Sequence, residues 1–125
     1  MSFQAQGLLC QYLSEDMSGI NLGTLELPQI EKDLVKIKIS HASLNFPDWL
    51  MSQGKYQRKP ELPFFLGMEG SGIIESVGPD VKELQTGDEV MFGGWGHGAM
   101  ANYIVLPASK ICLLYTSDAA DESVG

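Results

Sequence analysis

Two polar side chains beside an aromatic cluster are the best candidates for chemistry in this sequence. Asn45 lies where a predicted strand ends and a predicted helix begins, and Tyr56 follows that helix after a short loop. An amide and a phenol in such places can donate hydrogen bonds to a ligand carbonyl and stabilise negative charge on its oxygen. The residues alone favour the plainer alternative, in which Asn45 caps the helix and Tyr56 packs.

Other kinds of site lack their usual spacing. Two glycine-rich stretches, 70–72 and 93–98, do not complete G-x-G-x-x-G between a strand and a helix, so the dinucleotide fingerprint is missing. Ser71 lacks the G-x-S-x-G pattern of a nucleophilic serine. We expect no metal site, because the two histidines and the two cysteines form no ligand cluster along the chain.

The histidines and cysteines are therefore expected to have structural roles. His41 lies in phase with the apolar residues of the predicted strand 34–42, which predicts a partly buried histidine with a satisfied side chain. His97 lies in the glycine-rich loop and is expected to be solvated. Cys10 and Cys112 are interpreted as reduced thiols of a cytoplasmic protein, with a disulfide as the open alternative.

The composition is that of an ordinary folded domain. The chain has 125 residues, of which 44% are hydrophobic and 19% are charged. Its formal charge of −8 argues against nucleic acid or an anionic membrane as the main partner. No apolar run approaches the ~20 residues that span a bilayer, and the N-terminus has no signal-peptide pattern. We therefore expect one domain with a modest core.

Alternating and branched apolar residues predict a mainly β fold. The expected strands are Gln4–Tyr12, Leu22–Leu27, Leu34–Ala42, Ile73–Val77, Glu89–Phe92 and Met100–Leu106. A helix of about two turns is expected within residues 45–54, with Pro47 and Asp48 in its first turn and Gly54 just past its end. The glycines of residues 67–72 are expected to let the chain bend sharply between packed strands.

The end of the chain breaks this pattern. Residues Cys112–Glu122 do not continue the β pattern, and they resemble the conceptual translation of a transposase sequencing adapter. We therefore expect a domain at residues 1–111 and a non-native tail at residues 112–125, exposed and poorly ordered, with the native gene continuing past Lys110. The alternative is a native acidic terminus.

Several motifs within residues 4–111 together resemble the N-terminal, GroES-like domain of the medium-chain dehydrogenase/reductase superfamily. The motifs are Leu44–Asp48, Gln53–Tyr56, Leu62–Phe64, Gly67–Gly72 and Val77–Val81. This resemblance implies a partly open β-barrel with one or two short helices, followed in the parent protein by an α/β Rossmann domain. Within the superfamily the sequence looks most like the zinc-free NADPH:quinone oxidoreductase branch, the zeta-crystallin-like enzymes.

The choice of branch has a chemical basis. Zinc-dependent relatives carry a cysteine ligand just before the short helix and a Gly-His-Glu motif, whereas this chain has Asn45 and Met68 at those places and lacks the four-cysteine lobe. An amide and a thioether cannot replace a thiolate and an imidazole around a catalytic zinc. The resemblance therefore implies that hydrogen bonds, rather than a metal, polarise the substrate carbonyl.

The resemblance also implies a reaction. In the family, hydride passes from NADPH to a quinone or an α,β-unsaturated carbonyl in a cleft between the two domains. Asn45 and Tyr56 match the family's catalytic and cofactor-binding cleft residues, and Phe46 matches an apolar neighbour that contacts the cofactor. The parent is expected to be a homodimer. Because the Rossmann glycines lie outside this chain, we expect the chain alone to bind NADPH weakly or not at all and not to turn over.

Two other functions stay open. One is an enoyl-thioester reductase of the same superfamily, since pocket residues mostly outside these motifs select the acceptor. The other is a free-standing GroES-like binding or assembly module without catalysis. The second predicts a stop codon soon after Lys110, whereas either enzyme predicts an open reading frame into a βαβ unit.

Overall fold

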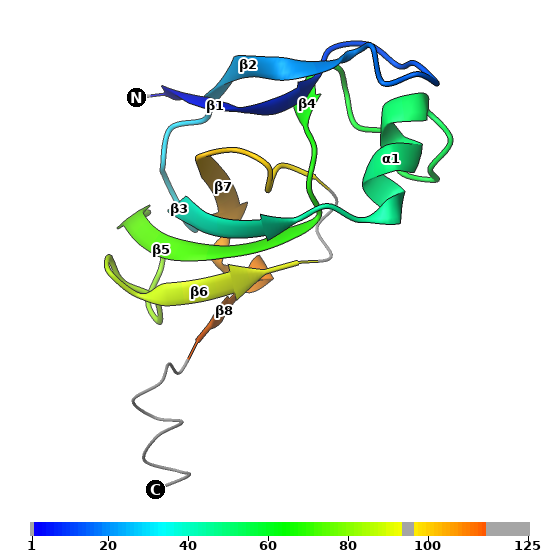
Figure 1. Cartoon of the computed structure of the whole chain (residues 1–125). Helices are drawn as coiled ribbons and strands as arrows, with labels where there is room; N and C mark the ends of the chain where they lie inside the picture. Colours follow the sequence, from blue (N-terminus) through cyan, green and yellow to red (C-terminus); the bar gives the residue numbers. More distant parts are fainter. Residues whose placement is uncertain (1, 94–96, 115–125) are drawn as a thin grey trace, which may run out of the picture.

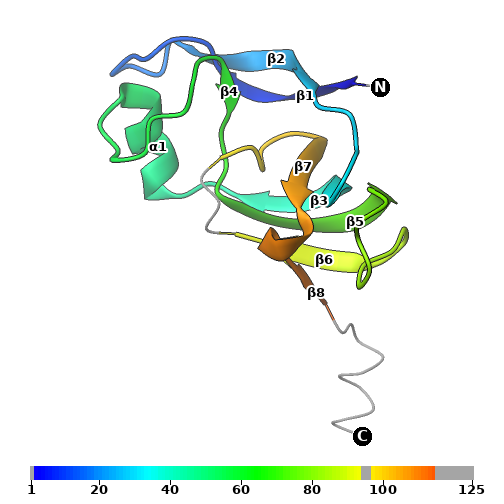
Figure 2. The same cartoon turned by 180° about the vertical axis from the view of Figure 1, so that it is seen from behind.

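The computed structural model describes residues 2–93 and 97–114, which form two antiparallel sheets and one α-helix (Figures 1 and 2). In chain order the elements are β1 Phe3–Cys10, β2 Ile20–Leu27, β3 Leu34–Ser43, α1 Phe46–Gln53, β4 Phe64–Phe65, β5 Glu69–Val77, β6 Glu89–Phe92, β7 Tyr103–Pro107, a 3₁₀ turn Ala108–Lys110 and β8 Ile111–Leu113. Within these residues no helix has the length and hydrophobicity needed to cross a membrane.

The two sheets curl into a half-barrel. The smaller sheet has the order β2-β1-β4 and the larger one β7-β3-β5-β6-β8. Residues 99–102 connect them, because the Asn102 N–H donates to the Gln6 carbonyl of β1 at 2.9 Å and the Asn102 carbonyl accepts the Ile39 N–H of β3 at 2.9 Å. The predicted mainly β, GroES-like fold class is confirmed.

Buried apolar side chains form three groups that hold these layers together. The largest fills the larger sheet: Val35, Ile37, Ile74, Leu84, Val90, Phe92, Ala99, Ile104 and Leu106. A second group, Cys10, Met51, Phe64 and Leu66, packs α1 against β1 and β4. The third, Ala5, Leu9 and Phe65, lies under the smaller sheet. The second group is the one that fixes α1, and with it Asn45, on the barrel.

Strand β3 follows the predicted alternation only over its first half. Val35 and Ile37 are completely buried, as expected. The pairing register with β5 then shifts between Ile39 and His41, which marks a β-bulge. A one-residue slip moves every later side chain to the opposite face. The prediction of a partly buried His41 was therefore wrong: its side chain is exposed.

Strand β5 begins at Glu69 rather than at Ile73. Its glycines allow close backbone approach, because a Cβ on Gly72 would lie 2.2 Å from a backbone carbonyl oxygen of β3. Gly67, just before the strand, has φ of 101° and makes the sharp bend. Ile73 is 45% exposed while Ile74 is 1% exposed, so β5 is half-buried rather than buried throughout.

The predicted helix is confirmed as α1. Asn45 is its N-cap residue, Pro47 and Asp48 lie in its first turn, and Gly54 ends it in the left-handed conformation with φ of 74°. Trp49 and Phe46 face outward, with their ring centroids 5.5 Å apart. The helix thus begins at the candidate site and presents aromatic rings beside it.

The β pattern extends further toward the C-terminus than we predicted. Cys112 and Leu113 belong to β8, which pairs with β6. These two residues had been assigned to a tail without β structure. Residues 115–125 lie outside the described part of the chain, so the expected exposure and origin of the tail stay predictions.

Candidate functional site

Asp48 is the residue that positions the start of α1. Its side chain is completely buried. Its carboxylate accepts the backbone N–H of Asn45 at 2.8 Å and the backbone N–H of Gly67 at 2.9 Å. Hydrogen bonds to an ionised acceptor are stronger than neutral ones. Asp48 therefore ties the first turn of α1 to the bend before β5, and it holds Asn45 against that bend.

The side chain of Asn45 is oriented by two further residues. Its Nδ2 donates to Glu69 Oε2 at 3.2 Å and lies 3.4 Å from Ser43 Oγ. Ser43 and Glu69 are paired across β3 and β5, which places both beside the helix start. An ionised carboxylate only accepts hydrogen bonds, so the nitrogen of the amide must face Glu69.

This orientation leaves Asn45 with an acceptor rather than a donor. The two Nδ2 hydrogens are directed to Ser43 and Glu69. Asn45 and Asp48 form a capping box, in which the side-chain oxygen of Asn45 faces the backbone N–H of Asp48 while that N–H also donates to the backbone carbonyl of Asn45 at 2.9 Å. The carbonyl oxygen of the Asn45 amide has a second lone pair, which could accept a hydrogen bond from a ligand, and the expected donor role toward a ligand carbonyl stays a prediction.

Two cavities flank the contact between Asn45 and Glu69. The first, the α1 cavity, has a volume of about 310 Å³ and is lined by Leu8, Met17, Ile20, Leu44, Asn45, Phe46, Asp48, Trp49 and Leu66. The second, the β5–β6 groove, has a volume of about 530 Å³ and is lined by His41, Ala42, Ser43, Glu69, Gly70, Ser71, Met91, Phe92, Gly93, Lys110, Cys112 and Leu114. Asn45 lines the α1 cavity, and its hydrogen-bond partners Ser43 and Glu69 line the β5–β6 groove.

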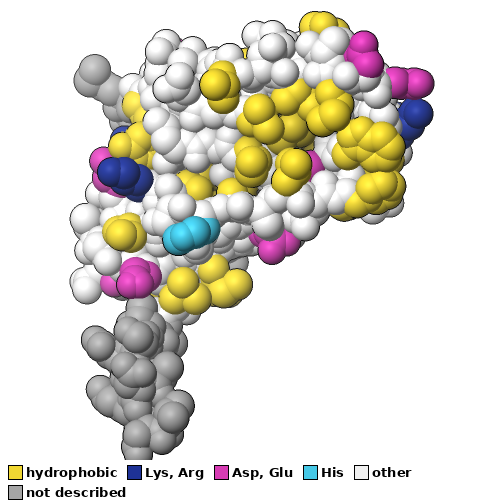
Figure 3. Space-filling model, in the orientation of Figure 1, with side chains coloured by type: hydrophobic (Ala, Val, Ile, Leu, Met, Phe, Trp, Pro, Cys, Tyr) yellow, Lys and Arg dark blue, Asp and Glu magenta, His cyan; other side chains and the backbone are white. Residues whose placement is uncertain are grey.

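Apolar side chains dominate the surface around the α1 cavity. Phe46 is 63% exposed and Leu44 is 60% exposed, and Met17 and Trp49 are also exposed. In the space-filling view, hydrophobic side chains gather on the face that carries α1 (Figure 3). Clustered exposed apolar side chains typically mark a surface that another group covers. This is a surface suited to an apolar ligand with one hydrogen-bonding group.

Tyr56 is not one of the described residues that line the α1 cavity. Its side chain is half-buried and packs against the group of Cys10, Met51, Phe64 and Leu66. The structure thus brings Asn45 and Phe46 to one cavity and places Tyr56 behind it, in the packing role of the plainer alternative. Its predicted contact with cofactor or substrate stays a prediction.

Sequence reasoning missed Asp48, Ser43 and Glu69 as parts of the site. The capping position of Asp48 was visible, but its bond to Gly67 depends on tertiary packing. Glu69 is far from Asn45 in the chain, and only the pairing of β3 with β5 brings the two together. The signal that could have found it is the glycine-rich stretch itself, which predicts close approach of two backbones.

Of the other reactive groups, His41 and Cys112 line the β5–β6 groove, and Cys10 is buried beneath α1. Burial raises the pKa of the Cys10 thiol, and Cys10 and Cys112 are both free. Among residues 2–93 and 97–114, no three His, Cys, Asp or Glu side chains gather closely enough to hold a metal ion. His97 was expected to be solvated, but it is half-buried and lines a different cavity.

Known proteins resemble this chain along most of its length. A quinone oxidoreductase-like protein 2 homolog of Nematostella vectensis is 37% identical over 99 residues, covering 79% of this chain and 25% of that protein. A zinc-type alcohol dehydrogenase-like protein of Schizosaccharomyces pombe is 34% identical over 107 residues, covering 69% of this chain and 31% of that protein. The crystal structure of a Pseudomonas syringae quinone oxidoreductase superposes on this chain with a TM-score of 0.80 at 28% identity, covering 90% of this chain and 34% of that structure's chain.

The chain therefore spans between a quarter and about a third of the length of these oxidoreductases. A family match covers residues 31–116 and is described as the alcohol dehydrogenase GroES-like domain. It runs past the domain end that we predicted at residue 111. The fold is thus shared with oxidoreductases, and the chain belongs to the GroES-like domain family of the medium-chain dehydrogenase/reductase superfamily.

Proposed function

We propose that this chain supplies the N-terminal catalytic domain of an oxidoreductase that transfers hydride from NADPH to a quinone or an α,β-unsaturated carbonyl. The family and the names of its relatives support an oxidoreductase. The observation that carries the finer proposal is the Asn45 amide, which Glu69 and Ser43 orient at the edge of an apolar cavity. One oriented polar group in apolar walls is the usual design of a site for a small organic ring.

Asn45 fits a reduced nicotinamide through its carbonyl oxygen. The carboxamide of nicotinamide carries two N–H donors, which an amide oxygen can accept. Glu69 and Ser43 would keep that oxygen in place, and the buried Asp48 would hold the backbone beneath it. The bound cofactor supplies the hydride, and the chain contributes orientation and a dry surface.

The walls of the α1 cavity favour an uncharged acceptor. Phe46, Trp49 and Leu44 present apolar surface, and a planar quinone or enone would bury it at little desolvation cost. Hydrogen bonds would polarise the carbonyl in place of a zinc ion, because Asn45 and Met68 are poor zinc ligands. The donor to that carbonyl has to come from Tyr56 after a rearrangement, from the cofactor or from another part of the protein.

An enoyl thioester is the second candidate acceptor. A solved structure of an Etr1p variant in complex with NADP and crotonyl-CoA superposes on this chain with a TM-score of 0.78. At 20% identity that likeness supports the fold alone. Phe46, which lines the α1 cavity, is 63% exposed, so the long chain of a thioester could leave the cavity past its ring.

A chimera tests the proposed function. Residues 1–114 would replace the matching third of the Pseudomonas syringae quinone oxidoreductase, and NADPH oxidation would be followed with 1,4-naphthoquinone and with crotonyl-CoA. We expect quinone-dependent oxidation that falls at least tenfold in the Asn45→Ala chimera and stays unchanged in the matched Asn21→Ala chimera. A folded chimera that binds NADPH but reduces neither acceptor would contradict the proposal. We also expect the 125-residue chain alone to bind NADPH weakly, and a micromolar dissociation constant for it would contradict that expectation.

A further inference from the structure

Helix α1 exposes aromatic side chains and buries polar ones. A helix on the surface of a domain normally does the reverse, with its apolar face on the core and its polar face in water. In α1 the polar Asp48 and Ser52 are completely buried beside Met51, whereas Phe46 is 63% exposed and Trp49 is 42% exposed. The buried polar groups have partners, since the Ser52 hydroxyl donates to the Trp49 carbonyl at 2.7 Å and Asp48 accepts two backbone N–H groups. Packing within this domain therefore accounts for the polar face but not for the exposed rings.

The exposed rings lie on the same side of the helix as Asn45. Residues three and four apart are neighbours on a helix surface, and Trp49 follows Asn45 by four residues, or one turn of about 5.4 Å. The rings of Phe46 and Trp49 contact each other, with centroids 5.5 Å apart and planes at 47°. Asn45, Phe46 and Trp49 all line the α1 cavity, and Met17 adds a thioether from the connection between β1 and β2. A flat ring system that begins at the Asn45 amide can thus extend over the indole of Trp49.

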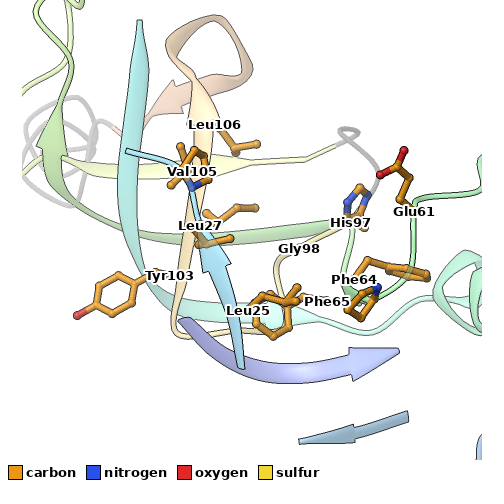
Figure 4. Close-up of a pocket in the computed structure, with 13 residues that line it drawn as sticks. Leu25, Leu27, Glu61, Phe64, Phe65, His97, Gly98, Tyr103, Val105 and Leu106 are labelled. Carbon is orange, nitrogen blue, oxygen red and sulfur yellow. The ribbon is translucent and has the colours of Figure 1, made fainter. Parts of the chain in front are cut away.

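A third cavity, between the two sheets, lacks this combination (Figure 4). It has a volume of about 480 Å³, its lining includes Leu25, Phe65, His97 and Leu106, and it shares no lining residue with the α1 cavity. Nδ1 of His97 is buried and has no hydrogen-bond partner among the described residues, so a ligand in that cavity cannot reach it. The α1 cavity, in contrast, joins exposed aromatic rings to an oriented amide.

We propose that Trp49 selects fused-ring quinones as acceptors, with the reacting ring beside Asn45 and the second ring against the indole. Offset stacking of two aromatic rings contributes binding free energy beyond the apolar area that it buries. A single ring held beside Asn45 leaves most of the indole uncovered, and the saturated chain of a thioester has no ring to stack on it. This inference rests on the proposed function, because it concerns the acceptor of the same site.

Paired ligands test the ring selectivity on the 125-residue chain without catalysis. Chromone and 4-pyranone share one carbonyl-bearing ring, and chromone adds a fused benzene ring. Amide and indole chemical shifts report both the affinity and the place of binding. We expect chromone to bind at least about tenfold more tightly, with shifts centred on Leu44, Phe46 and the indole N–H of Trp49. Trp49→Leu should reduce that preference about fivefold, the ratio that one stacked aromatic pair supplies. The matched Tyr12→Leu removes an exposed ring that does not line the α1 cavity, and should keep the preference.

The chimera described above tests the same residue in turnover, with 1,4-naphthoquinone and 1,4-benzoquinone as acceptors. The kcat/KM of each variant is divided by that of the unsubstituted chimera with the same quinone, so the intrinsic reactivities of the quinones cancel. Trp49→Leu should lower kcat/KM about fivefold for naphthoquinone, through KM, and less than about twofold for benzoquinone. Trp49→Phe keeps an aromatic ring and should restore most of the loss.

The outcomes separate this inference from the proposed function. Equal losses with both quinones, no loss with either, equal affinities for chromone and 4-pyranone, or a chromone preference that survives Trp49→Leu would each overturn the role of Trp49. If the chain prefers chromone through Trp49 but the chimera reduces neither quinone, the selectivity at Trp49 is supported and the proposed function is contradicted.

Discussion

Replacing Asp48 by Asn tests whether this buried carboxylate organises the site. In the structure it accepts two backbone N–H groups, from Asn45 at 2.8 Å and from Gly67 at 2.9 Å. Asn has nearly the same shape but offers one acceptor oxygen and one NH₂ group. One of the two backbone donors would therefore face another donor, in a place with no access to water.

The size of the effect follows from these two bonds. A hydrogen bond to a charged group contributes about 1.5–3 kcal/mol, and an unsatisfied buried donor costs about 1–3 kcal/mol. Asp48→Asn weakens both bonds and leaves one donor unpaired, so we expect the free energy of unfolding to fall by about 3 kcal/mol. With a urea slope of about 1–3 kcal/mol/M, the midpoint of unfolding should move down by at least ~1 M.

The matched control is Asp88→Asn. The carboxylate of Asp88 accepts one backbone N–H, that of Gln85 at 3.0 Å, in an exposed setting. The same change there should lower the unfolding free energy by less than about 1 kcal/mol, because water can replace the lost bond. Urea unfolding followed by tryptophan fluorescence measures both variants. Equal losses of unfolding free energy at the two positions would refute the inference that the buried Asp48 carboxylate joins α1 to the bend before β5.

Three further predictions use other parts of the fold. Burial lowers the pKa of His97 below the ordinary 6.5, so the unfolded chain takes up a proton before the folded chain does as the pH falls. The free energy of unfolding should therefore decline from about pH 7 downward through 6.5, and His97→Phe should flatten that decline in thermal melts. Iodoacetamide should label the exposed Cys112 rapidly and the buried Cys10 only on unfolding, as peptide mass spectrometry can show; equal labelling would contradict the packing of β1. Gly72→Ala should destabilise the fold by about 2 kcal/mol or more, since the added Cβ would lie 2.2 Å from the Lys38 carbonyl oxygen of β3. Gly93→Ala, whose Cβ would lie 3.4 Å from that of Glu69, should be nearly neutral, and urea unfolding measures both variants.

The sequence predicted the longer strands and the short helix because their signals are local, and it missed the two-residue strand β4. Alternating apolar residues identify β3, and the proline, aspartate and glycine of residues 47–54 identify α1. It failed at His41, because a β-bulge depends on the partner strand and leaves no mark in the alternation of one strand. It also ended the β structure too early, at Leu106, because three-residue edge strands such as β8 have almost no pattern.

The candidate site was predicted in part. Asn45 could be named from its place at a strand end and Phe46 from the family resemblance, and both line the α1 cavity. The polarity of the Asn45 contact could not be predicted, since it is set by Glu69, which reaches Asn45 only through strand pairing. Nor could the orphaned nitrogen of His97 be predicted, because its burial depends on the packing of two sheets. Long-range contacts, rather than residue types, decide both features.

The most direct measurement of the central claim is the affinity of the chimera for NADPH with and without the Asn45 amide. If Asn45 presents an acceptor to the nicotinamide carboxamide, Asn45→Ala should weaken NADPH binding about fivefold or more, the size of one hydrogen bond, while Asn21→Ala leaves it unchanged. Fluorescence titration of the reduced cofactor gives both dissociation constants. An Asn45→Ala chimera that binds NADPH and transfers hydride as well as the unsubstituted one would contradict the account.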